Sequence, residues 1–139
     1  MSFHDEVVPM LHRDIEALHN GDAGPRKEMW SHAEPVVLFG AGMSGVGWTE
    51  VEQVFDTIEK WFHGSRSLDI EVVAAESSGD IGYVCAVERS EILDPTGAPK
   101  SYALRVTTVF RREDGAWRMV HRHGSPVDDR ARDALNSIR

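Results

Sequence analysis

The part of the chain from Leu68 to His123 contains extended segments separated by turn signals, with no helical pattern between them. Its first segment, Leu68-Asp-Ile-Glu-Val-Val, alternates apolar and polar residues as a half-buried strand does. Turns are predicted at Ser78-Gly79-Asp80, at Asp94-Pro-Thr-Gly97 and at Arg112-Glu-Asp-Gly115. Strands joined by such short turns pair in antiparallel order. The sequence therefore predicts a meander of four strands, which start near Leu68, Ile81, Tyr102 and Trp117.

Helices are predicted in the first half of the chain. Apolar residues recur at helical spacing from about Glu6 to Asn20, and Gly21 ends this segment. Asp22 is expected to cap a short second helix that contains Met29 and Trp30. Both helices precede a short apolar strand at Pro35-Val-Val-Leu-Phe39.

A third helix has the clearest signal in the sequence. Thr49-Glu50-Val51-Glu52 has the sequence of a capping box, whose side chains satisfy free N–H groups at a helix start. Gly64 ends the helix. Its apolar positions follow at helical intervals: Val51, Val54, Phe55, Ile58, Trp61 and Phe62. Three N-terminal helices followed by a meander indicate the α+β class, with the helices packed on one face of a curved, mainly antiparallel sheet.

The length of 139 residues fits one domain. We expect residues 1–127 to form it and residues 128–139 to form a polar tail or short helix without assigned chemistry. The net charge of −8 disfavours nucleic-acid partners, which require cationic surfaces. Neither a secretory signal nor an apolar run of membrane-spanning length is visible, and Cys85 is the only cysteine. A cytoplasmic protein without a membrane partner is expected.

The stretch Gly40-Ala-Gly42-Met-Ser-Gly45 matches the dinucleotide-binding pattern G-x-G-x-x-G. In a nucleotide site these glycines open a helix, whereas here the helical signal starts only at Thr49 and strands follow it. We therefore interpret Gly40–Gly47 as a mobile glycine loop at the rim of a site.

The last predicted hairpin carries the candidate site. A three-residue turn closed by Gly115 would place Arg105 opposite His123 and Thr107 opposite His121. Because side chains alternate between faces, these four residues and Trp117 would share one face. The other face would carry Leu104, Val106, Phe110 and Val120. A two-residue Asp-Gly turn would shift the register by one and separate Arg105 from the histidines.

Two histidines beside an arginine favour small-molecule chemistry. We expect His123 or His121 to transfer a proton, since imidazole titrates near neutral pH, and Arg105 with Thr107 to bind the ligand. The alternative is that either histidine is a hydrogen-bonded structural residue. Two histidines fall short of a zinc site, so no metal or cofactor is predicted. The tryptophans Trp30, Trp48 and Trp61 have either a core or a pocket role, and Tyr83 is either exposed or at the pocket.

Three stretches resemble a known family: "NGD" at Asn20–Asp22, "SGDIGYV" at Ser78–Val84, and "LRVTTVFRREDGAWRMVHRHGSP" at Leu104–Pro126. They resemble the SnoaL-like branch of the superfamily that contains nuclear transport factor 2 and ketosteroid isomerase. The resemblance covers about residues 5–126. The segment Arg105–Ser125 is also similar to the association domain of calcium/calmodulin-dependent kinase II.

This resemblance implies a cone-shaped, cystatin-like roll with a pocket between sheet and helices, and a homodimer formed through the sheet's outer face. It implies that Arg105 lies in the pocket and that the apolar set of Leu104, Val106, Phe110 and Val120 suits the dimer face. The aspartate base and the tyrosine–aspartate pair of ketosteroid isomerase have no counterpart in the sequence, so steroid isomerisation is not supported.

The sequence thus supports two hypotheses. The first is a small-molecule-binding protein with lyase or isomerase activity, which transfers a proton on a small carbonyl or carboxylate compound. The second is a non-catalytic module for ligand sensing or oligomerisation.

Overall fold

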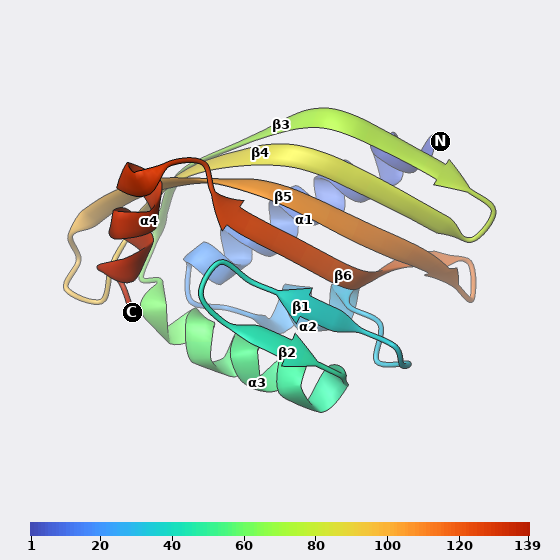
Figure 1. The fold of residues 1–139 in the computed structure, drawn as a ribbon, viewed down its shortest axis with the longest axis horizontal. Coiled ribbons are helices and arrows are strands. Elements are labelled where there is room, and N and C mark those ends of the chain that lie inside the picture. Colours follow the sequence, from blue (N-terminus) through green and yellow to red (C-terminus); the bar gives the residue numbers. More distant parts are fainter.

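The computed structural model describes residues 1–139 and shows a curved sheet with helices against it (Figure 1). Its helices are α1 (Phe3–His19), α2 (Gly24–Met29), α3 (Trp48–Ile58), the single 3₁₀ turn η1 (Glu59–Trp61) and α4 (Asp129–Asn136). Its strands are β1 (Val37–Phe39), β2 (Ser44–Val46), β3 (Ser65–Ser78), β4 (Ile81–Leu93), β5 (Pro99–Glu113) and β6 (Ala116–Pro126). None of the helices combines the length and apolar character needed to cross a membrane.

The six strands form one sheet in the order β2-β1-β6-β5-β4-β3. The meander β3–β6 is antiparallel, as predicted, and β1 joins it by pairing parallel with β6. This pairing places Leu38 beside Arg122 and Phe39 beside His123. The α+β class and the mainly antiparallel sheet are confirmed; besides the three predicted N-terminal helices, α4 forms a short helix in the segment where a polar tail or short helix was predicted.

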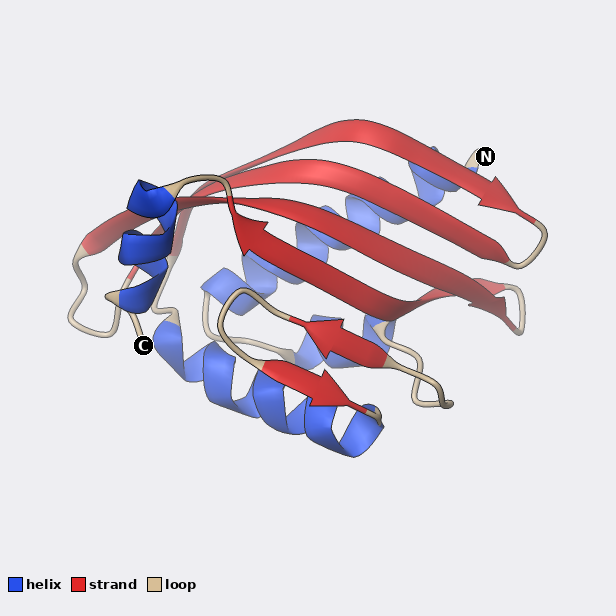
Figure 2. Ribbon diagram, in the orientation of Figure 1, coloured by secondary structure: helices blue, strands red, loops and turns tan.

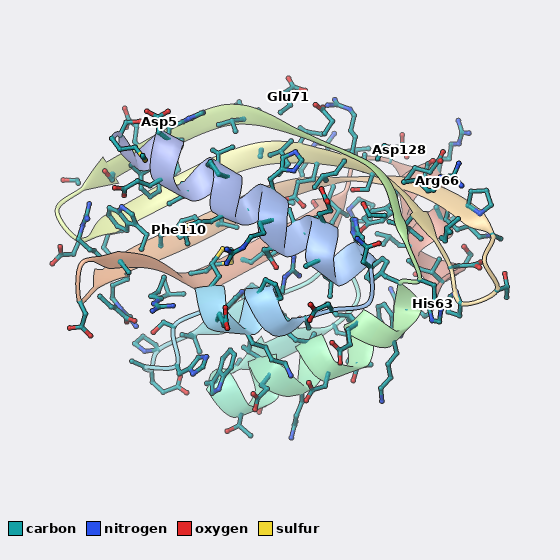
Figure 3. All side chains as sticks on the ribbon, turned by 180° about the vertical axis from the view of Figure 1, so that it is seen from behind. Asp5, His63, Arg66, Glu71, Phe110 and Asp128 are labelled. Carbon is teal, nitrogen blue, oxygen red and sulfur yellow. The ribbon has the colours of Figure 1, made fainter.

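Helix α1 crosses behind the sheet, while α3 lies along β2 (Figure 2). Ser2 caps α1 by accepting a hydrogen bond from the Asp5 N–H, and Gly21 follows the helix with a φ of 83°. The apolar stripe of α1 is buried: Val7, Leu11, Ile15 and Leu18. Figure 3 shows Asp5 at one end of the molecule and Asp128 at the other. The helices and the inner face of the sheet enclose a single hydrophobic core.

Two predicted helix starts are wrong. Helix α3 begins at Trp48 after Gly47, and no side chain at its N-cap bonds to the helix. Instead the Glu34 carboxylate accepts the Trp48 N–H at 2.8 Å, so a distant residue satisfies the free donor. Helix α2 begins one residue later than predicted, with Ala23 at the N-cap position, but Asp22 still accepts the Gly24 N–H at 2.8 Å. Only at α3 is the local capping pattern replaced by a distant residue.

The glycine stretch is only partly a loop. Ser44–Val46 forms β2 and pairs with β1, because backbone donors and acceptors of β1 need partners on the side away from β6. The remaining Gly40–Met43 segment connects the two strands. It lies beside the C-terminal segment: Arg139 approaches Gly42 closely enough that a Cβ there would lie 2.5 Å from an Nη atom.

The predicted hairpin register is wrong. Asp114 and Gly115 form a two-residue turn with φ values of 50° and 79°, and a bulge then lies at Val120 between the Phe110 and Val109 pairings. Thr107 therefore pairs with His123, Val109 with His121, and Arg105 with Ser125. The turn and the bulge each shift the pairing by one residue, so Arg105 and both histidines again share a face.

The predicted grouping of Arg105, Thr107 and both histidines on one face is right, but the predictions that Trp117 joins them and that this face lines the pocket are wrong. Leu104, Val106 and Phe110 are buried toward the helices, and Trp117 joins them rather than the histidines. Arg105 and His123 are exposed on the outer face. The alternation of residues along a strand does not show which face is buried when either face could line a pocket. Here the buried face also carries charged residues from β4 and β6.

Candidate functional site

An internal cavity of about 90 Å³ lies between the inner face of the sheet and the helices. Hydrophobic residues make up 12 of its 19 lining residues. They come from α1, α3, η1 and β5 and include Ile15, Leu18, Val54, Trp61, Phe62 and Leu104. The Gly40–Met43 loop and the C-terminal residues Leu135 and Arg139 complete the wall. Such an apolar enclosure with few polar groups is typical of a small-molecule site.

A buried ion pair forms one part of the cavity wall. The Arg122 guanidinium of β6 donates to both carboxylate oxygens of Glu88 on β4, at 3.0 and 2.7 Å, across the intervening strand β5. Burial alone would lower the pKa of Arg122, but the Glu88 charge and hydrogen bonds outweigh burial and raise that pKa. Arg122 is therefore held charged inside the protein.

A second buried ion pair joins the first two helices. Arg26 of α2 donates to Asp14 of α1, with its Nε 2.8 Å from one oxygen and its Nη2 3.3 Å from the other. Arg26 lines the cavity, whereas Asp14 stands behind it and is only 1% exposed. The pair fixes α2 against α1, because separating either partner would leave an unpaired charge in the interior.

His19 and Tyr102 form the third polar feature of the wall. The His19 Nε2 and the Tyr102 hydroxyl lie 2.5 Å apart, and both residues line the cavity. Burial, together with the charges of Arg26 and Arg122, lowers the pKa of His19 to about 3. Burial and the Glu88 charge raise the pKa of Tyr102. At neutral pH the pair is thus a neutral imidazole and a protonated phenol.

The direction of this hydrogen bond decides what the cavity offers a ligand. His19 Nδ1 is buried without a partner. With the proton on Nε2, His19 donates to the Tyr102 oxygen, and the phenolic O–H can donate to Ser90 or to a ligand. With the proton on Nδ1, Tyr102 donates to His19 instead. Ligand binding by Tyr102 therefore requires the first arrangement.

Of the aromatic candidates, Trp61 alone lines the cavity. Trp30 is buried in the core and packs edge-on against Phe55, with ring centroids 5.4 Å apart. Trp48 stacks on His32 at 3.9 Å outside the cavity. Tyr83 is 38% exposed on the outer face of the sheet.

The other predicted site residues lie on the outer face of the sheet. Arg105, Thr107, His121 and His123 occupy outward positions of β5 and β6, and none of them lines the cavity. The His121 ring nitrogen Nδ1 bonds to the Val37 carbonyl at 2.8 Å, which gives this ring a structural role. Phe39 lies edge-on to both imidazoles, at 5.5 and 5.6 Å. Catalysis by either histidine stays a prediction, and it would concern a ligand bound on this outer surface.

The sequence contains a signal that reveals the polar groups of the cavity. Glu88 and Arg122 occupy strand positions whose neighbours two residues away are buried, such as Ala86 and Ser90 beside Glu88. Asp14 lies on the apolar stripe of α1, between Leu11 and Leu18. A charged residue in phase with an apolar pattern indicates a buried, paired charge. No three His, Cys, Asp or Glu side chains lie together as a metal site would require.

The curved sheet, the covering helices and the cavity between them form a fold that this chain shares with nuclear transport factor 2-like structures. The chain belongs to the SnoaL-like domain family, whose model matches residues 7–129. No curated protein sequence matches it.

Solved structures share this fold at low sequence identity. A nuclear transport factor 2-like superfamily protein from Salmonella enterica is 15% identical with a TM-score of 0.70, over 88% of this chain and 89% of that one. A ketosteroid isomerase-like protein from Erwinia carotovora is 17% identical with a TM-score of 0.69, over 86% and 92%. A calcium/calmodulin-dependent kinase II association-domain-like protein from Thiobacillus denitrificans is 22% identical with a TM-score of 0.68, over 86% and 91%. The predicted resemblance is confirmed as a likeness of fold.

Proposed function

We propose that the chain binds a small organic compound in the internal cavity, with a carbonyl or carboxylate oxygen at the Tyr102 hydroxyl. The observation that carries this proposal is the His19–Tyr102 pair, a neutral imidazole and a protonated phenol that both line a largely apolar cavity. Because Tyr102 is buried with a raised pKa, it keeps its proton and can donate to a ligand oxygen. Apolar lining residues exclude water and strengthen that hydrogen bond.

The chemistry that this arrangement favours is proton transfer beside a carbonyl, in a lyase or isomerase reaction. Tyr102 would stabilise negative charge that develops on the carbonyl oxygen. Glu88 is the only carboxylate among the lining residues and would accept the proton. Arg122 holds this carboxylate in place with two hydrogen bonds.

One observation favours the alternative, a non-catalytic ligand sensor. Both oxygens of Glu88 already accept hydrogen bonds from Arg122, so taking up a proton would disrupt this ion pair. His19, with a pKa lowered to about 3, is also a weak base. A ligand would then bind and leave unchanged.

Exchange of α-hydrogens for deuterium separates the two functions without knowledge of the natural substrate. With cyclopentanone in D₂O, the enzyme hypothesis predicts that the protein accelerates exchange, measured by NMR. Tyr102→Phe is expected to slow the accelerated exchange at least about tenfold, because it removes the donor to the developing oxyanion.

Tyr83→Phe is the matched control, since it makes the same chemical change on the outer face and should leave exchange unaltered. Binding of cyclopentanone without exchange would favour the sensor. Equal effects of the two Tyr→Phe substitutions would contradict a role for Tyr102.

We further propose a homodimer through the outer face of the sheet. Phe39, Val46, Ile81 and Tyr83 are exposed there, between 38% and 64%. They belong to β1, β2 and β4 of one sheet, so exposed apolar side chains lie on both sides of the intervening strands β6 and β5. Such surfaces on soluble proteins mark contact sites.

Tyr83→Lys is expected to convert the dimer to a monomer in sedimentation velocity, because the substitution buries an unpaired charge in the interface. Gln53→Lys introduces the same charge on the exposed side of α3 and should leave the dimer intact. A wild-type protein that sediments as a monomer, or two variants that behave alike, would refute this interface.

A further inference from the structure

We infer that Arg139 selects ligands with an anionic carboxylate at the mouth of the cavity. This inference rests on the proposed function and names the ligand class of the same site. Three arginines line the cavity: Arg26, Arg122 and Arg139. The first two donate to Asp14 and Glu88, whereas Arg139 has neither an ion pair nor a hydrogen bond. It is therefore the one cation of the wall whose charge is not already compensated.

The position of Arg139 is held by its neighbours in the chain. Ala131 and Ile138 are 5% and 2% exposed, so α4 and the residues after it are anchored in the core. Leu135 lines the cavity from the same segment. Arg139 is itself exposed, so its guanidinium belongs to both the cavity wall and the solvent. A ligand with an apolar body and a charged end would place the body in the cavity and the charged end beside this guanidinium.

Gly42 makes room for this guanidinium. A Cβ on Gly42 would lie 2.5 Å from Nη2 and 2.7 Å from Cζ of Arg139, which is too close for either atom. The φ of Gly42 is not positive, so its backbone accepts a larger residue. The lack of a side chain at residue 42 thus matters for the placement of Arg139 rather than for the loop conformation.

A carboxylate is the group that this site recognises. A planar guanidinium donates two parallel hydrogen bonds to a carboxylate, and such charge-assisted bonds are stronger than neutral ones. The net charge of −8 repels anions over the molecule as a whole, so a preference for an acid has to arise locally. A cavity of about 90 Å³ is smaller than the roughly 150 Å³ cavity that accepts benzene, which indicates a short apolar body.

The test compares pentanoate with pentanamide, which have the same length and differ in charge. Binding is followed by chemical-shift changes in ¹H–¹⁵N spectra of the full chain. The wild type is expected to bind pentanoate about tenfold more tightly than pentanamide. Arg139→Gln should abolish this preference and leave pentanamide binding within about twofold, because only the charged contact is lost. Arg130→Gln is the control, since it removes the same charge from α4 at a residue that lines an outer groove.

A second variant keeps the charge and moves it. Gly42→Ala displaces the flexible guanidinium, so it should reduce the preference for pentanoate without removing a cation. Equal binding of acid and amide in the wild type, or an unchanged preference in Arg139→Gln, would overturn the role of Arg139 and leave the cavity proposal intact. Absence of shifts at cavity residues with both compounds would overturn the two proposals together.

Discussion

Replacing Glu88 with glutamine is expected to lower the free energy of unfolding by about 3–5 kcal/mol. Glu88 and Arg122 are only 4% and 7% exposed, and each charge depends on the other for compensation. The amide has nearly the shape of the carboxylate, so packing is retained while Arg122 is left as an unpaired buried cation. Urea unfolding at neutral pH measures the loss.

The control is an exposed pair on β4 and β3. Arg89 and Glu71 lie 2.8 Å apart and are more than half exposed, so Glu71→Gln should cost less than about 1 kcal/mol. The double variant Glu88→Leu/Arg122→Met should recover most of the stability, since it removes both charges and fills the space. Equal costs for Glu88→Gln and Glu71→Gln would show that the interior pair is not desolvated.

The second large effect concerns pH. Stability is expected to fall by about 2–3 kcal/mol between pH 6.5 and about pH 4.5 through His19 alone. The pKa of His19 is lowered to about 3 in the folded protein from the ordinary 6.5. Between these two pH values the unfolded chain binds a proton at His19 and the folded chain does not. Above pH 6.5 both states are neutral and His19 has no effect; below it, each pH step of one favours unfolding by about 1.4 kcal/mol until the folded pKa is reached.

Unfolding in urea across this range checks the prediction. His19→Gln should remove most of the dependence of the unfolding free energy on pH, even if it also changes the stability at neutral pH. His12→Gln is the matched control on the same helix, because His12 is exposed. The lowered pKa of Asp94, caused first by its hydrogen bond from Thr96, makes its contribution to stability fall as the pH drops through the ordinary value of 3.8, which is below this range. A slope that survives His19→Gln would contradict a neutral, desolvated His19.

The fold follows from the sequence because its signals are local and repeated. The meander was readable from turn residues and alternation, and the two-residue turn at Asp114 and Gly115 was one of two open alternatives. The bulge at Val120 was not readable, since no residue type marks it. β2 was hidden because Ser44-Gly45-Val46 has the composition of a loop and becomes a strand only beside β1.

The candidate site was harder to predict for a different reason. Histidines and arginines are concentrated in one hairpin of the sequence. This cluster led to the prediction of a site on one face of that hairpin. The cavity takes its polar groups singly from α1, α2, β4, β5 and β6, so Tyr102 and His19 are 83 positions apart in the chain. Only Trp61 among the predicted ligand-binding residues lies at this cavity. Spacing rules cannot join residues that meet only after the chain has folded.

The parallel pairing of β1 with β6 has a thermodynamic consequence. Along three consecutive residues the chain passes from the cavity wall at Leu38 to the outer surface at Phe39 and the cavity mouth at Gly40. A ligand that shifts this short strand would alter the surface through which two copies are proposed to associate. Linkage is reciprocal, so the factor by which occupancy changes subunit affinity equals the factor by which assembly changes ligand affinity. Titrations at two protein concentrations would then give different dissociation constants for the same compound.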